Sequence, residues 1–114
     1  MNLLAVALGG ALGSVLRYVM VQMIMGPWAV MIVNVLGSFV MGLAFVFLAG
    51  RDQLSLLVMT GMLGGFTTFS AFSLDAFKLW EAGRMAEAGL YVLGSVLISL
   101  VAVTLGAALA RSLA

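Results

Sequence analysis

Four long apolar stretches, separated by short polar interruptions, constrain this sequence more than any other feature. They run from about Leu3 to Met25, Trp28 to Leu48, Leu54 to Leu79 and Ala88 to Leu109. At about 1.5 Å per residue, each stretch is long enough as a helix to cross a hydrocarbon core of about 30 Å. The sequence therefore predicts an all-α integral membrane protein with four transmembrane helices, in which residues 1–114 form a single domain.

The composition agrees with this class and excludes several others. Hydrophobic residues make up 65% of the 114 residues and charged residues 8%, and the mean hydropathy of +1.29 lies outside the range of soluble globular domains. The absence of cysteine and histidine excludes disulfides, thiol chemistry and the commonest metal ligands. We expect no enzyme activity, because no nucleophile is paired with a base. The first stretch lacks the basic segment of a secretory signal, so we expect it to be retained.

The third stretch contains the segment least typical of a spanning helix, residues 61–77 with the sequence GMLGGFTTFSAFSLDAF. Small and hydroxylated residues replace the usual Leu and Val there, namely Gly61, Gly64, Gly65, Thr67, Thr68 and Ser70. Opened backbone groups are tolerated in a bilayer only where they line a cavity or hold a ligand, and transporters place ion sites at such breaks. We therefore expect a broken third helix with an ion site, although small residues also permit close helix packing.

The basic residues outside the apolar stretches are divided almost evenly between the two membrane sides. Four spans place Arg51 and Arg111 on the side of both termini, and Lys78 and Arg84 on the opposite side. Orientation in the membrane follows the Lys/Arg imbalance of short loops, and here there is almost none. The sequence therefore predicts a dual-topology, antiparallel homodimer with its two-fold axis in the membrane plane. The alternative is that four charges are too few to count.

Two further patterns predict packing rather than chemistry. Small residues recur at four-residue spacing and favour close assembly of helices, at Gly9 and Gly13 in the first stretch and at Ala102, Gly106 and Ala110 in the fourth. Asp75 and Lys78, three residues apart, are expected to form an ion pair near the end of the third stretch.

Arg17 and Asn34 are the strongest polar signals inside the apolar stretches. An arginine within a spanning helix costs about 2.5–3.5 kcal/mol on insertion scales, so Arg17 should face water, a partner or an anion. It could line a vestibule and raise the local anion concentration, or it could extend to the membrane interface. Asn34, with Ser38 one turn later, could line a pore or join two helices, because a carboxamide offers two donor hydrogens.

Hydroxyls and aromatic rings supply further candidate contacts for an anion. Tyr91, Ser95 and Ser99 are spaced four residues apart and stay within a sector of about 80° of one helix. Phe69 and Phe72 lie on one face just beyond the expected break, and the edge of an aromatic ring is electropositive. The alternatives are hydroxyls that bond back to their own helix and an aromatic pair that belongs to the core. The length of the line favours a polar track.

Together these residues resemble the Fluc (CrcB-type) family of fluoride channels. The resemblance is carried by GGALGSVLRY at residues 9–18, VNVLGSF at 33–39, GMLGGFTTFSAF at 61–72 and the hydroxyl line of the last stretch. It covers essentially the whole chain in length, number of spans and order of motifs. The resemblance implies a fluoride-selective channel that exports fluoride passively across the bacterial cytoplasmic membrane, through two pores between two antiparallel subunits.

The resemblance also implies roles for single residues. A structural sodium ion at the dimer centre would be bound by the carbonyl oxygens of Gly64 and Thr67 from both subunits, and Arg17 would lie at the aqueous entrance. The implied fluoride pathway comprises Asn34, Ser38, Phe69, Ser70, Phe72, Tyr91, Ser95 and Ser99.

The sequence departs from the family pattern at Ala29 and Val30, where Gly-Thr is usual, at Ala71, where Thr is frequent, and at Asp75, where Glu is usual. These departures leave the order of sites along the track open. The main alternative function is a small four-helix multidrug or cation exporter. That mechanism needs an acid in the first span, which here carries Arg17 and no acid. A second alternative is an assembly subunit that transports nothing, which would not explain the hydroxyl line.

Overall fold

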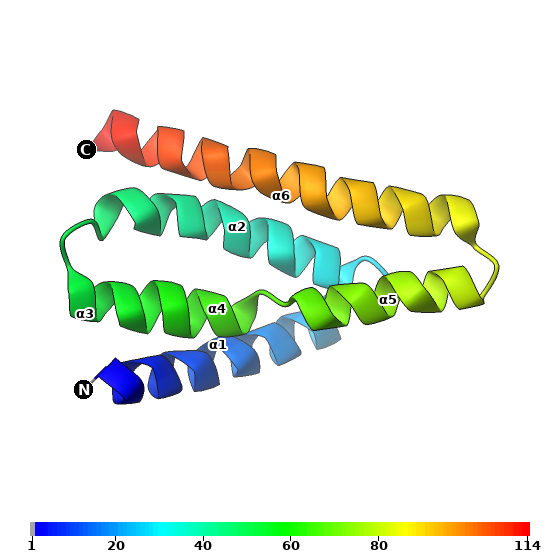
Figure 1. Ribbon diagram of the computed structural model, residues 1–114, viewed down its shortest axis with the longest axis horizontal. Coiled ribbons are helices and arrows are strands. Elements are labelled where there is room, and N and C mark those ends of the chain that lie inside the picture. Colours follow the sequence, from blue (N-terminus) through cyan, green and yellow to red (C-terminus); the bar gives the residue numbers. More distant parts are fainter. Residues whose placement is uncertain (1) are drawn as a thin grey trace.

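The computed structural model describes residues 2–114, which form four antiparallel columns of helix (Figure 1). The segments are α1 (Asn2–Ile24), α2 (Ala29–Phe47), α3 (Asp52–Ser55), η1 (Leu56–Leu63), α4 (Gly64–Phe66), α5 (Phe69–Glu81) and α6 (Met85–Leu113). The segments from α3 to α5 follow one another in a single column, and both termini lie at the same end of the molecule (Figure 1). The bundle measures 47 × 31 × 20 Å.

Each of the four columns is long and apolar enough to span a membrane, which confirms the predicted number of spans. These spans are Asn2–Ile24, Ala29–Phe47, Asp52–Glu81 and Met85–Leu113. All three connections between them are short, and each contains a glycine with a positive φ angle, at Gly26 (89°), Gly50 (82°) and Gly83 (76°). Glycine adopts this left-handed conformation without a steric penalty, which allows the chain to reverse direction at once. The chain is therefore a multi-pass membrane protein.

The third column changes its backbone conformation along its length. The first helical turn, α3, passes into η1, a π-helical segment of 8 residues, and then into the short α4. Thr67 (φ −84°, ψ 153°) and Thr68 (φ −151°, ψ 127°) have extended backbones, and α5 starts at Phe69. The hydroxyl of Thr68 caps α5 by accepting a hydrogen bond from the backbone N–H of Ala71 (3.2 Å), as threonine commonly does at a helix N-terminus.

The helices pack as two close pairs, α2 against α6 and α1 against η1 and α4. A Cβ atom at Gly13 would overlap the carbonyl oxygen of Met62, and one at Gly106 would overlap the carbonyl oxygen of Phe39. The small residues at four-residue spacing are all buried and pack within one chain, namely Gly9, Gly13, Ala102, Gly106 and Ala110. Close packing of helices at these residues, as the sequence predicts, takes place between helices of the chain itself.

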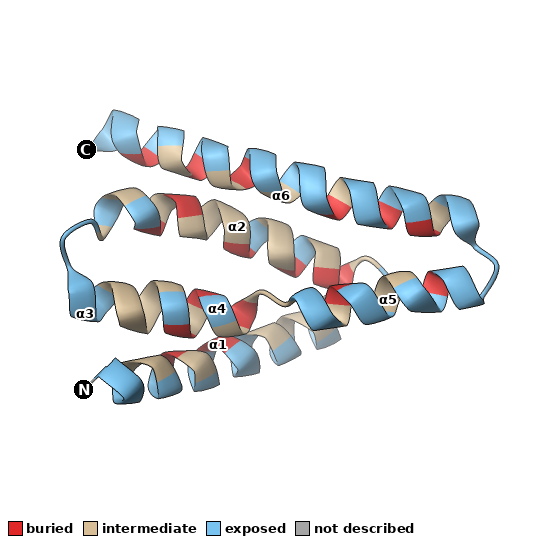
Figure 2. Cartoon of the chain, in the orientation of Figure 1, coloured by how far each residue is buried: buried red, intermediate tan, exposed pale blue. Residues whose placement is uncertain are grey.

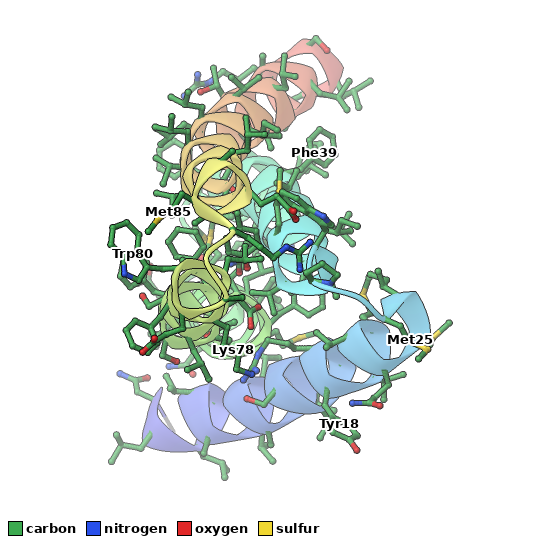
Figure 3. All side chains as sticks on the ribbon, turned by 90° about the vertical axis from the view of Figure 1, so that its right-hand side faces the viewer. Tyr18, Met25, Phe39, Lys78, Trp80 and Met85 are labelled. Carbon is green, nitrogen blue, oxygen red and sulfur yellow. The ribbon has the colours of Figure 1, made fainter. Side chains whose placement is uncertain are left out.

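The outer faces of the bundle are apolar and exposed, whereas buried positions face the neighbouring helices (Figure 2). Tyr18 and Trp80, for example, project away from the bundle (Figure 3) and are 66% and 58% exposed. A surface of this kind suits contact with lipid, because helices whose outer faces are apolar are typical of membrane spans.

Candidate functional site

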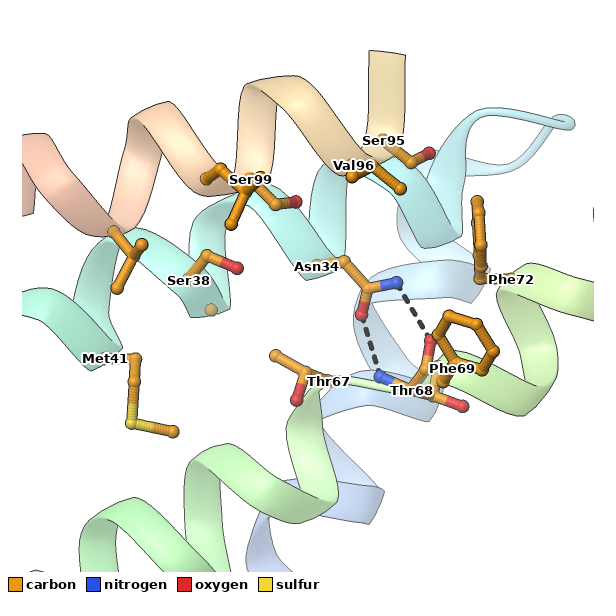
Figure 4. Close-up of a pocket in the computed structure, with 13 residues that line it drawn as sticks. Asn34, Ser38, Met41, Thr67, Thr68, Phe69, Phe72, Ser95, Val96 and Ser99 are labelled. Atoms are coloured by element: carbon orange, nitrogen blue, oxygen red, sulfur yellow. Dashed lines mark hydrogen bonds between the residues drawn. The ribbon is translucent and has the colours of Figure 1, made fainter. Parts of the chain in front are cut away.

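A pocket of about 410 Å³ opens between α2, the segment at Thr67 and Thr68, and α6. We call it the polar pocket. It brings together six residues of the predicted pathway, namely Asn34, Ser38, Phe69, Phe72, Ser95 and Ser99 (Figure 4). Its remaining lining consists of Gly37, Met41, Thr67, Thr68, Val96, Leu100 and Val103. No residue that lines the pocket within residues 2–114 carries a charge. The pocket therefore offers neutral polar groups and apolar walls.

Asn34 is fixed at the pocket by two hydrogen bonds to the backbone of a single residue. Its Nδ2 donates to the carbonyl oxygen of Thr68 (2.9 Å), and its Oδ1 accepts from the N–H of Thr68 (2.8 Å) (Figure 4). The amide side chain thereby replaces the helical partners that the extended backbone has lost. Because Nδ2 carries two hydrogens, one donor hydrogen of Asn34 is left for a ligand.

The same region deprives two backbone carbonyls of their usual helical donors. In a continuous helix, the N–H of Thr68 would bond to the carbonyl of Gly64, and that of Ala71 would bond to the carbonyl of Thr67. Instead, the N–H of Thr68 bonds to Asn34 and the N–H of Ala71 bonds to the hydroxyl of Thr68. The carbonyls of Gly64 and Thr67, which the family resemblance implies as sodium ligands, have thus lost these donors. Among residues 2–114, no cluster of three acidic or otherwise metal-binding side chains exists.

Ser95 and Ser99 provide two hydroxyls on the α6 wall of the pocket. Both oxygen atoms are buried, and neither has a hydrogen-bond partner within residues 2–114. Thr104, farther along the same helix, bonds back to the carbonyl of Leu100 (2.9 Å). The two serines therefore keep a donor and an acceptor available at buried positions, where a missing partner is costly.

Phe69 and Phe72 form a tilted pair with ring centroids 5.4 Å apart and an interplanar angle of 54°. Phe69 is 76% exposed, whereas Phe72 is 7% exposed and stacks on Tyr91 at 5.4 Å. Tyr91 itself is fully buried behind Phe72 and does not line the pocket.

Asp75 accepts a hydrogen bond from the hydroxyl of Tyr91 (3.2 Å). The predicted ion pair of Asp75 with Lys78 is wrong, since the one salt bridge within residues 2–114 joins Arg84 and Glu87. Asp75 bonds to Tyr91 instead, because the hydroxyl of a buried tyrosine requires a hydrogen-bond partner, whereas Lys78 is exposed.

Arg17 and Ser70 lie outside the lining of the polar pocket. The Nε atom of Arg17 donates to the carbonyl oxygen of Gly65 (3.1 Å), next to the carbonyl of Gly64. Ser70 is exposed, and its hydroxyl lies 3.3 Å from that of Thr68. The sequence did not identify Thr68 as the partner of Asn34 or Gly65 as the partner of Arg17. Both residues belong to the glycine and hydroxyl segment, but no sequence pattern pairs them with residues so far away.

Comparison with known proteins gives consistent matches over nearly the whole chain. The family described as CrcB-like protein, Camphor Resistance (CrcB), matches residues 4–107. A protein of Rhizobium etli (strain CIAT 652) named fluoride-specific ion channel FluC is 50% identical over 119 residues, covering 96% of this chain and 95% of the relative. Proteins of the same name from Paracoccus denitrificans (strain Pd 1222) and Agrobacterium fabrum (strain C58 / ATCC 33970) are 50% and 43% identical. The alignments cover 96% and 98% of this chain, and 94% and 98% of those relatives.

Proposed function

This chain belongs to the CrcB-like protein family, and from this premise we propose that it is a fluoride-selective ion channel. The names of its relatives supply the ion. The observation that carries the proposal for this chain is the polar pocket, where neutral donors meet inside a membrane-spanning bundle. Such donors suit a small, strongly hydrated anion, because conduction requires binding that replaces water and still allows the ion to leave.

In the proposed pathway, fluoride exchanges its hydration shell for groups of the protein. Asn34 supplies its remaining amide hydrogen, and the hydroxyls of Ser95 and Ser99 rotate their hydrogens towards the ion. The edges of Phe69 and Phe72 add positive electrostatic potential without a formal charge. Ser38 lines the pocket from α2. Flow is passive and follows the fluoride gradient out of the cell across the cytoplasmic membrane.

The remaining pathway residues act at the edges of the pocket. Tyr91 supports Phe72 from behind and extends the hydroxyl line of α6. Ser70 lies at the exposed side of the extended segment. Arg17 stands at the aqueous entrance and attracts anions, while its bond to Gly65 holds the end of α4 in place.

We further propose that the pore is completed by a second, antiparallel copy of the chain. The polar pocket is open along one side of the bundle, and the exposed Phe69 stands at its rim. Two copies related by an axis in the membrane plane would close two such pockets. The even distribution of Lys and Arg between the two ends supports insertion in both orientations.

A sodium ion at the centre of this dimer fits the groups that are present. The carbonyl oxygens of Gly64 and Thr67 are hard ligands suited to such a cation, and they are the two whose helical donors are redirected. When bound, the ion would supply fixed positive charge between the subunits. Within the chain, Asn34 and the hydroxyl of Thr68 accept the backbone N–H groups that would otherwise bond to these two carbonyls.

Fluoride efflux from liposomes tests the function directly. We expect wild-type protein to release fluoride, read with a fluoride electrode, and to release neither chloride nor a cationic dye. Phe72→Ile should abolish fluoride flux, because it removes a ring edge from the pocket while preserving an apolar side chain. Dye extrusion driven by a pH gradient would instead favour a multidrug exporter. Fluoride flux of wild-type size in a folded Phe72→Ile dimer would refute the assignment of Phe72 to the pathway.

Removal of sodium tests the cation site separately from conduction. Exchange of sodium for a bulky organic cation should lower the thermal unfolding temperature of the purified dimer, since a ligand bound only to the folded state stabilises it. Adding sodium back should restore the original unfolding temperature. Thermal unfolding in detergent measures both changes. An unfolding temperature that is the same in both salts would exclude a stabilising sodium.

A further inference from the structure

A second crevice lies at the end of the bundle that holds both termini, apart from the polar pocket. It has a volume of about 410 Å³ and lies between the C-terminal ends of α2 and α6 and the segments α3 and η1. Its walls are mainly apolar and include Phe45, Leu48 and Met59, and its one charged lining residue in the described chain is Arg111. We call it the Arg111 crevice.

The guanidinium of Arg111 is available to a ligand. The salt bridge formed within residues 2–114 joins Arg84 and Glu87 at the opposite end of the bundle, so no carboxylate neutralises Arg111. Ser55, the other polar side chain of the crevice, donates its hydroxyl to the carbonyl of Leu48 (3.0 Å) and closes the turn after α2. A ligand in this crevice therefore meets one cation and apolar walls.

The depth of the crevice in the membrane follows from the length of α6. Its 29 residues extend over about 44 Å, which exceeds the hydrocarbon core of about 30 Å and equals a bilayer with its headgroups. Arg111 lies two residues before the end of α6 at Leu113, which is the level of the headgroups. Phe45, near the end of the neighbouring α2, is 58% exposed, so an apolar wall open to lipid adjoins Arg111.

We propose that the Arg111 crevice binds an anionic phospholipid. Arginine holds a phosphate through two parallel hydrogen bonds, and basic pockets between transmembrane helices bind anionic headgroups. The acyl chain would lie against Phe45 and Met59. This proposal requires only insertion in a membrane and does not depend on fluoride conduction. In an antiparallel dimer, the two crevices would lie in opposite leaflets.

Native mass spectrometry of protein released from nanodiscs tests the site. The nanodiscs contain equal amounts of phosphatidylglycerol and phosphatidylcholine. Wild-type protein should retain phosphatidylglycerol about fivefold more often, the preference expected of one basic residue near the surface. Arg111→Gln should abolish this preference, and Arg111→Lys should keep part of it through the retained charge.

Arg51→Gln is the matched control, because Arg51 lies at the same end of the bundle and does not line the crevice. It should retain the wild-type preference. Equal retention of the two lipids by the wild type, or equal losses in both glutamine variants, would overturn the proposal. Displacement of the lipid by soluble glycerol phosphate would also overturn it, since the apolar walls would then contribute nothing. A monodisperse elution profile establishes that each variant is folded.

Discussion

In the proposed pathway, the side chain of Asn34 has both a structural and a functional task. Its carboxamide satisfies both backbone groups of Thr68, and Nδ2 keeps a second hydrogen on a side chain that lines the polar pocket. Asn34 is partly buried, and these two hydrogen bonds hold its side chain in a fixed orientation, as a selective donor requires.

Asn34→Asp separates these two tasks. A carboxylate can still accept from the N–H of Thr68, but it cannot donate to the carbonyl of Thr68 or to an anion. Its negative charge would also repel fluoride. We expect fluoride flux in liposomes to fall by more than about tenfold, the factor that corresponds to one lost hydrogen bond. Flux of wild-type size from a correctly folded Asn34→Asp dimer would show that Asn34 does not contact the ion.

Ser95→Ala and Ser99→Ala should lower flux without lowering stability. Both hydroxyls are buried without a partner, so their removal breaks no internal hydrogen bond and can raise the free energy of unfolding by about 1 kcal/mol. Thr104→Ala is the matched control, because its hydroxyl bonds back to its own helix, and it should keep wild-type flux. Thermal unfolding and fluoride efflux are measured together. A structural role for the serines would instead appear as lower stability with unchanged flux.

The sequence identified most side chains of the polar pocket but not their partners. Helical spacing placed Ser95 and Ser99 on one face, because that periodicity is local. The bond from Asn34 to Thr68 and that from Tyr91 to Asp75 depend on how distant helices pack. Neighbours in sequence suggested Lys78 for Asp75, and burial of the tyrosine decided otherwise.

At the level of helices, glycines determine how closely α1 approaches the third column. Gly13 contacts the backbone near Met62, and a Cβ at Gly65 would meet the carbonyl of Gly10 at 2.7 Å. Gly13 lies one turn before Arg17, whose side chain bonds to Gly65. We call this glycine contact between α1 and the third column the seam. It supports the segment that carries the candidate cation ligands.

Gly13→Ala and Gly10→Ala form a matched pair within α1. A Cβ at Gly13 overlaps the neighbouring backbone, whereas one at Gly10 meets nothing within 4 Å. We expect Gly13→Ala to destabilise the protein by about 1–3 kcal/mol through overpacking. Gly10→Ala should be neutral or stabilise by about 0.5–1 kcal/mol. Thermal unfolding in detergent measures both, and equal shifts would contradict this account of the seam.

The elements themselves were largely predictable, because apolar stretches of membrane-spanning length leave few alternatives to helices. The turns at Gly26, Gly50 and Gly83 also followed the polar interruptions of the sequence. The π-helical segment η1 was not predicted. Its apolar sequence resembles that of any spanning helix, so its wider turns have no local signal.

For the whole molecule, the balance of basic charge at the two ends leads to a topological prediction. Reporters fused after Ala114, one fluorescent only in the cytoplasm and one active only outside it, should both give signals. Three lysines added at the turn that contains Arg51 should shift all copies to one orientation, since short loops rich in Lys and Arg stay inside. A signal from only one reporter in the unmodified chain would exclude dual topology, and with it the antiparallel dimer.

The pairing of Asn34 with Thr68 joins positions separated by 34 residues. Because α2 precedes Thr68 in the chain, it emerges from the ribosome first, and the carboxamide of Asn34 lacks this partner until the third column follows. Only arrival of the third column completes the pair. A chain truncated before that point would leave the amide of Asn34 without this partner, and an unpaired polar group is costly to bury in lipid.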